Sequence, residues 1–84
     1  MPDGGHRDAD LLAIGRALKT AREQQSMSIE ALAHVTGVSG SRIRTLEAGL
    51  LDPTYELLLV LSDGLGMEPS TLVAMAQQRR SSSG

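Results

Sequence analysis

Hydrophobic residues recur at intervals of three and four along most of this chain, the spacing that places side chains on one face of an α-helix. The first predicted helix covers residues 10–24, with Asp8 or Asp10 as its N-cap. Its inward face is formed by Leu11, Ile14, Leu18 and Ala21. No stretch shows the period-two alternation of a half-buried strand, so the pattern predicts an all-α protein.

Two short helices are predicted in the middle of the chain, over residues 29–36 and 40–48. Ser28 and Ser39 directly precede them and can cap their N-termini through a side-chain oxygen. Gly37 is suited to the positive φ of a turn between the two helices.

Two short helices joined by a tight, glycine-containing turn form a helix-turn-helix when they cross closely. Ala33 is small enough to permit that crossing, although other small helical bundles share some of these features. The residues expected to face the core of this unit are Leu32, Ala33, Val35 or Thr36, Val38, Ile43 and Leu46.

Two more helices are expected after a loop at residues 50–53. Thr54 caps the fourth, which runs to about Leu65 and should be the central and most buried helix. Pro69 begins the fifth, which runs to Gln78. The apolar faces of these two helices comprise Leu57, Leu58, Val60, Leu61, Leu72, Met75 and Ala76, with Met67 filling the core between them.

The 84 residues, of which 40% are hydrophobic, suffice for one small domain. We expect that domain at residues 9–78, between flexible tails at residues 1–8 and 79–84. The chain has no cysteine and no apolar run of membrane-spanning length, so we expect a cytoplasmic protein with no membrane partner.

The charge is distributed unevenly along the chain. The formal net charge is −2, yet residues 15–51 contain five basic and three acidic residues, whereas residues 52–78 contain four acidic and no basic ones. A basic excess in the middle of the fold is compatible with a polyanionic partner, but on charge alone an ordinary solvated surface is the favoured explanation.

Chemistry-bearing motifs are missing from the sequence. His6 and His34 are far apart, and no carboxylate pair, phosphate loop or metal-ligand spacing is present, so we expect no enzyme, no metal site and no cofactor. Tyr55 is the single aromatic residue, which excludes a stacking surface for single-stranded nucleic acid.

Three segments together resemble a known family. They are IGRALKTAREQQSMS, EALAHVTGVSGSRIRTLEAG and DPTYELLLVLSDGLGMEPSTL. The chain is similar over residues 12–74 to the lambda-repressor-like, Cro/C1-type helix-turn-helix domains, also called the xenobiotic-response-element family of transcriptional regulators. The resemblance implies a compact all-α, five-helix DNA-binding domain, and a structural ion pair between Arg22 and Glu47.

The resemblance further implies that the helix at residues 40–48 enters the major groove of double-stranded DNA while the start of the preceding helix lies over phosphates. Ser28 would hold a phosphate, Arg44 would read bases with Ser41 and Thr45, and Arg42 would contact a phosphate. The outward residues would be Ser39, Gly40, Ser41, Arg42, Arg44 and Thr45. We expect the two arginines to point outward together.

The sequence departs from the family pattern at three places. Ile29 stands where members usually have glutamine, Gly40 replaces a polar base-contacting residue, and Leu50 and Leu51 replace a basic loop. At least one of these leucines should be buried. Weaker phosphate contact follows from these departures, and with it an alternative: a protein-interaction module, antitoxin-like or regulator-binding, that keeps the fold with weak or no DNA binding.

A palindromic DNA site would require two copies of the chain. We expect a homodimer formed through the region of the fifth helix. The candidate contacts are Leu72, Val73 and Met75, for which core packing is the other interpretation.

Overall fold

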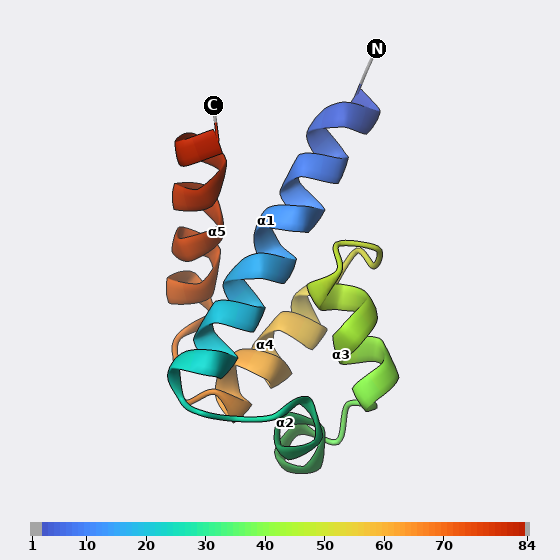
Figure 1. The fold of residues 1–84 in the computed structure, drawn as a ribbon, viewed down its shortest axis with the longest axis vertical. Coiled ribbons are helices and arrows are strands. Elements are labelled where there is room, and N and C mark those ends of the chain that lie inside the picture. Colours follow the sequence, from blue (N-terminus) through green and yellow to red (C-terminus); the bar gives the residue numbers. More distant parts are fainter. Residues whose placement is uncertain (1–2, 84) are drawn as a thin grey trace.

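The computed structural model describes the backbone of residues 3–83 and the side chains of residues 9–79. Five helices and no strand occur within this range, so the predicted all-α, five-helix fold is confirmed (Figure 1). The helices are α1 (Asp3–Gln24), α2 (Ile29–Thr36), α3 (Gly40–Glu47), α4 (Tyr55–Gly64) and α5 (Pro69–Ser83).

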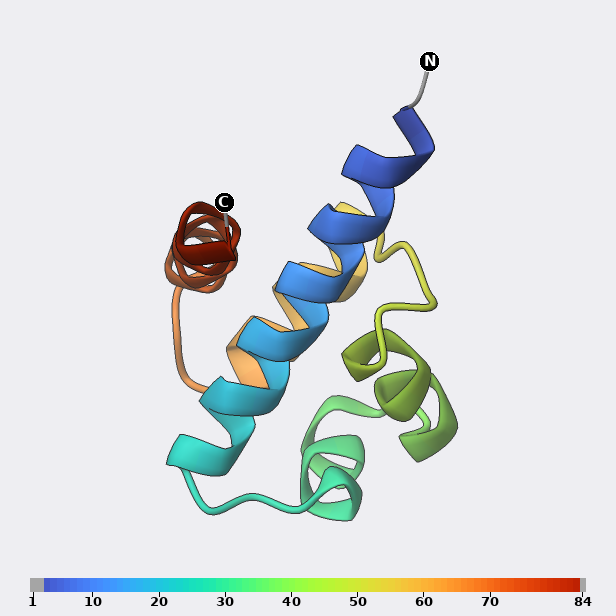
Figure 2. The same ribbon diagram turned by 45° about the horizontal axis from the view of Figure 1, so that its top comes forward.

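Helix α1 is the element around which the others are arranged. It packs most extensively along α5 and also contacts α3, while α2 contacts α3 and α4, and α4 contacts α5. Figures 1 and 2 show α5 on one side of α1 and the α2–α3 pair on the other. The helix-turn-helix therefore lies away from α5.

The short helices α2 and α3 begin directly after their predicted caps; α2 ends at Thr36 as predicted, and α3 ends at Glu47, one residue before its predicted end. Ser28 Oγ accepts a hydrogen bond from the Ala31 amide at 2.9 Å, and Ser39 Oγ accepts one from the Arg42 amide at 3.1 Å. Gly37 has a φ of 77° and ends α2. Helices of eight residues are marginal alone, and each cap contributes about 1 kcal/mol to holding its helix.

The core contains nearly all of the predicted inward residues. The large side chains that are completely or almost completely buried are those of Leu18, Leu32, Ile43, Leu46, Leu61, Leu65 and Leu72. The sequence left open whether Val35 or Thr36 of α2 faces the core. Thr36 is half-buried and donates from Oγ1 to the Leu32 carbonyl at 2.7 Å, whereas Val35 is exposed.

Helix α4 is less buried than expected. Leu57 and Leu61 are buried, but Leu59 and Val60 are each 37% exposed. The main contacts of α4 are with α2 and α5, so one of its faces remains open to solvent. The prediction that α4 is the most buried helix with Val60 on its inward face is wrong.

Helices α1 and α5 extend beyond their predicted ends. Because α1 begins at Asp3, residues 3–7 are not an irregular tail, and Asp8 and Asp10 lie inside the helix and cannot be its N-cap. Helix α5 likewise continues past Gln78 to Ser83. Adding a residue to an existing helix costs little compared with starting one, so sequences of low apolar content can prolong a helix.

Residues 1, 2 and 84 of the expected tails lie outside the described residues. The domain boundaries at residues 9 and 78 stay a prediction.

Within the described residues, no single helix has both the length and the apolar composition needed to cross a membrane. Helix α4 and residues 69–79 of α5 reach the required length and apolar composition only when they are taken together, and this pair is bent by 103°.

A close approach of backbones joins α1 to α3. A Cβ atom added to the buried Gly15 of α1 would lie 2.4 Å from the Leu46 carbonyl oxygen and 2.8 Å from that of Glu47. Both atoms belong to the backbone at the end of α3. A glycine at position 15 is therefore required for α3 to approach α1.

We predict that Gly15→Ala destabilises the protein by about 2 kcal/mol or more, because the overpacking exceeds the gain in helix propensity. Gly40→Ala is the matched control, since a Cβ there would meet its nearest neighbours at an ordinary 3.5 Å. The free energy of unfolding in urea measures both. Equal stability of the two variants would contradict the close α1–α3 contact.

Candidate nucleic-acid interface

Helix α3 presents a polar face to solvent. Ile43 and Leu46 are buried against the core, which leaves the remaining sides of the helix accessible. All six residues predicted to face outward lie at the surface, with Gly40 and Thr45 half-buried and the others exposed: Ser39, Gly40, Ser41, Arg42, Arg44 and Thr45. The helix is therefore not covered by the rest of the described chain.

The two arginines of α3 do not point outward together, so that expectation is corrected. Residues two apart on an α-helix differ in direction by about 200°. Arg42 and Arg44 consequently flank the exposed face on opposite sides, with the buried Ile43 between them on the inward side. Ser41 and Thr45 occupy the centre of the exposed face, and Thr45 Oγ1 donates to the Ser41 carbonyl at 2.9 Å.

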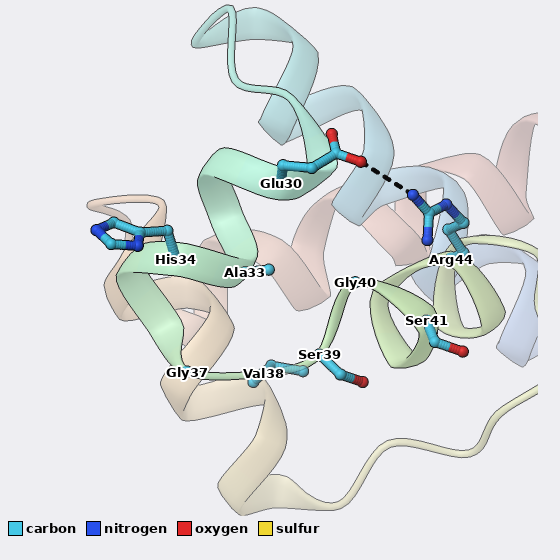
Figure 3. Close-up of a pocket in the computed structure, with 9 residues that line it drawn as sticks. All are labelled: Glu30, Ala33, His34, Gly37, Val38, Ser39, Gly40, Ser41 and Arg44. Atoms are coloured by element: carbon cyan, nitrogen blue, oxygen red, sulfur yellow. Dashed lines mark hydrogen bonds and ion pairs between the residues drawn. The ribbon is translucent and has the colours of Figure 1, made fainter.

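The Arg44 side chain is turned toward α2. Its Nη2 atom donates to Glu30 Oε2 at 3.0 Å, and the two side chains are 57% and 75% exposed (Figure 3). A Cβ built on Gly40 would lie 3.5 Å from Arg44 Nη1 and 3.5 Å from Ile29 Cγ2. The guanidinium group therefore lies beside Gly40, near the N-terminal end of α3.

Glu30 was not identified from the sequence as a residue of the site. It is the acidic residue in the first turn of α2, and fourteen positions separate it from Arg44. No local periodicity connects residues on two different helices. The crossing of α2 and α3 alone decides that these side chains meet.

An open groove of about 570 Å³ lies between α2 and α3. In Figure 3, Glu30 and Arg44 meet at one end of it, and the His34 side chain points away from Arg44. The hydroxyl groups of Ser39 and Ser41 lie on the α3 side, so the groove is bordered by hydrogen-bonding and charged groups (Figure 3). Among the described residues, no group of three or more His, Asp or Glu side chains is placed to hold a metal ion.

The start of α2 combines an anion-attracting and an anion-repelling feature. Ser28 is exposed, and amides in the first turn of a helix have no acceptor within the helix. Such amides and the positive end of the helix dipole attract anions. The carboxylate of Glu30 in the same turn opposes this attraction, and its ion pair with Arg44 offsets the repulsion.

Arg22 and Glu47 form a buried ion pair between α1 and α3. Arg22 Nε donates to Glu47 Oε2 at 2.8 Å, and Nη2 donates to Oε1 at 2.9 Å. Nη1 donates to the Met27 carbonyl at 2.8 Å, so the guanidinium also holds the loop that leads to α2. The hydrogen bond to Glu47 raises the pKa of Arg22 above its ordinary value, against the opposing effect of burial. The pair thus fixes the C-terminal end of α3.

The two leucines of the loop after α3 differ in their burial. Leu51 packs against the core, and Leu50 is 77% exposed. The expectation that at least one of them is buried is met in part, because Leu51 is partly buried, and Leu50 is an exposed apolar side chain directly after α3.

A family model described as a helix-turn-helix domain matches residues 13–75. The chain therefore belongs to the helix-turn-helix domain family, and its resemblance to the Cro/C1-type regulators is confirmed. No curated protein is similar enough in sequence to count as a match.

Solved structures of bacterial regulators share this fold. The restriction-modification controller protein C.AhdI from Aeromonas hydrophila is 31% identical, with 76% of this chain and 97% of that chain covered and a TM-score of 0.74. The clp gene regulator ClgR from C. glutamicum is 26% identical, with 83% and 91% covered and a TM-score of 0.80. An HTH_3 family transcriptional regulator from Vibrio cholerae is 30% identical, with 84% and 41% covered and a TM-score of 0.76. The family and these neighbours are regulators rather than enzymes, and they support a role in transcription regulation by DNA binding.

We predict that Glu47→Ala destabilises the protein by about 3 kcal/mol, because it leaves the buried Arg22 without its carboxylate. Urea unfolding provides the measurement. Arg42→Ala removes an exposed charge from the same helix and should change stability by less than about 0.5 kcal/mol. Similar losses in both variants would show that the ion pair has no special structural role.

Proposed function

We propose that this chain is the sequence-specific, double-stranded-DNA-binding domain of a transcriptional regulator, with α3 as its recognition helix. The observation that carries the proposal is the uncovered polar face of α3 in a chain of the helix-turn-helix family. A major groove about 12 Å wide accepts an α-helix of about 10–12 Å in diameter. An α3 docked in this way would bring its exposed side chains to base edges and phosphates.

The side chains of α3 divide into two roles by their direction. Ser41 and Thr45, at the centre of the exposed face, would approach base edges together with Arg44, whose guanidinium can bond both acceptors of a guanine. Arg42, on the opposite flank, would reach a phosphate of the groove wall. Ser28 at the start of α2 and Ser39 at the start of α3 would contribute further contacts to the phosphate backbone of the DNA.

A protein-interaction module is the second candidate function. The exposed Leu50 beside the helix-turn-helix and the acidic residue in the first turn of α2 favour it. Mobility of random duplex DNA at low and moderate salt separates the two functions. A DNA-binding domain retards the duplex at low salt and loses affinity as salt rises, whereas an interaction module leaves its mobility unchanged.

We further propose that the domain acts as a homodimer through the α5 region. Of the three candidate contacts, Leu72 is buried in the core and Met75 is packed against it, so Val73, at 40% exposed, is the one that remains accessible. Contacts through α5 would leave α3 free, because these helices lie on opposite sides of α1 (Figures 1 and 2). A cytoplasmic location is part of the same proposal, since a bacterial-type regulator meets DNA there.

We predict that Arg44→Ala weakens binding to the preferred duplex about 5- to 100-fold and relaxes the choice of base at one position per half-site. Arg42→Ala should weaken binding to all duplexes alike and reduce the slope of log affinity against log salt by about one. Selection from a random duplex pool, followed by titrations at several salt concentrations, measures both. Lys19→Ala, which removes an exposed charge from α1, is the control. Unchanged affinity in both arginine variants would refute the assignment of α3.

We predict that Val73→Glu prevents dimer formation, because it places a charge in an apolar contact. Affinity for a duplex with two half-sites should then fall to that for a single half-site. Analytical ultracentrifugation and DNA titration give the two readouts. Leu50→Glu adds the same charge outside α5 and should leave the oligomeric state unchanged. A dimer that persists in Val73→Glu places the contact elsewhere.

A further inference from the structure

The Arg44–Glu30 pair has a geometry suited to base recognition. In a docked helix-turn-helix, residues at the N-terminal end of the recognition helix contact base edges. Arg44 is the fifth residue of α3, so its backbone lies about 6 Å further along the helix than that of Gly40. Its side chain nevertheless runs back to Gly40, which brings the positive charge to the N-terminal end of α3.

We propose that Glu30 is a positioning residue that aims the Arg44 guanidinium at a guanine, an inference that rests on the proposed function. Three features confine the guanidinium: Glu30 accepts from Nη2 at 3.0 Å, Gly40 leaves space beneath Nη1, and Ile29 borders the same space. Ile29 and Gly40 are two of the departures from the family pattern. Together they replace polar side chains with a place for the arginine.

The hydrogen-bond donors of Arg44 allow both partners at once. A guanidinium group has five N–H donors, and the pair with Glu30 uses one of those on Nη2. The second Nη2 donor and those on Nη1 remain, and such neighbouring donors can bond O6 and N7 of a guanine together. Glu30 therefore does not have to release Arg44 before the base is bound.

Holding the side chain before DNA arrives reduces the conformational freedom that is lost on binding. In the free protein both side chains are more than half exposed, so water screens the pair and it contributes little to stability. Docking on DNA would remove water from the groove between α2 and α3, and the same pair becomes stronger in that less polar surrounding. The pair thus restrains Arg44 in the free protein and becomes stronger in the complex.

The opposite role for Glu30 is that of a competitor, which repels phosphates and holds Arg44 away from the bases. The two roles predict different effects of its removal. A positioning residue contributes to the choice of guanine, so its loss lowers discrimination between bases. A competitor lowers affinity for every duplex, so its loss raises affinity for all sequences equally.

The test begins with selection of a preferred duplex by the wild-type chain. That duplex is then titrated, together with duplexes in which the guanine read by Arg44 is replaced by another base. We expect Glu30→Ala to lower the preference for guanine about two- to fivefold at the position that Arg44 reads, and to have no further effect on this preference in the Arg44→Ala background. Glu30→Gln retains an acceptor oxygen and should keep a larger share of the preference. Glu68→Ala removes an exposed acidic side chain at the start of α5 and serves as the control.

Three outcomes overturn the inference. They are an unchanged guanine preference in Glu30→Ala, an equal gain of affinity for all duplexes, and an equal loss of preference in Glu68→Ala. If the wild-type chain selects no sequence, the proposed function fails and this inference fails with it. The wild-type arm thus distinguishes the two failures.

Nuclear magnetic resonance of the free protein gives a readout without DNA. The heteronuclear NOE of the Arg44 Nε–H group reports picosecond-to-nanosecond motion of the side chain, and it should be lower in Glu30→Ala than in the wild type. Gly40→Leu places carbon atoms where the guanidinium lies and should lower it as well, whereas Gly40→Ala should not. Equal values in the wild type and Glu30→Ala would overturn the inference.

Discussion

The orientation of α3 depends on its junction with α1. The buried, two-bond ion pair between Arg22 and Glu47 holds the last residue of α3, and Gly15 lets the backbones of the two helices touch at the same point. An eight-residue helix is too short to be stable or to keep its direction alone. The uncovered polar face of α3 exists because this junction fixes which side of the helix faces the core.

The helix-turn-helix combines local and long-range restraints. Ser28, Gly37 and Ser39 determine where α2 and α3 begin and end, through caps and a positive φ. The direction of the charged side chains comes from the crossing of the helices, which joins Arg44 to Glu30. The net charge of −2 therefore does not identify the binding partner. It counts all charged side chains alike, whereas opposite charges on neighbouring helices pair with each other and change the local charge of the surface.

Most errors of the sequence-based predictions concern features that do not depend on neighbouring residues within one helical turn, such as the length of a helix or the side on which it is packed. The pattern of apolar residues does not show that α1 continues back to Asp3, because extension of an existing helix needs no apolar face. It also assigns Val60 to the core, since it contains no information on which side of α4 has a neighbour. The direction of Arg42 relative to Arg44 is an exception, because the helical period alone places them on opposite flanks.

The sequence by itself determined the helical class, the N-terminal caps Ser28, Ser39 and Thr54 of α2, α3 and α4, and most of the core, because hydrogen bonds to caps and apolar periodicity act over a few residues. Resemblance to a family supplied the pairing of Arg22 with Glu47. Only the tertiary structure decided that Gly15 is a contact point, that Leu50 is exposed while Leu51 is partly buried, and that Glu30 holds Arg44. These features join residues of different elements, and their distances depend on helix packing rather than on spacing along the chain.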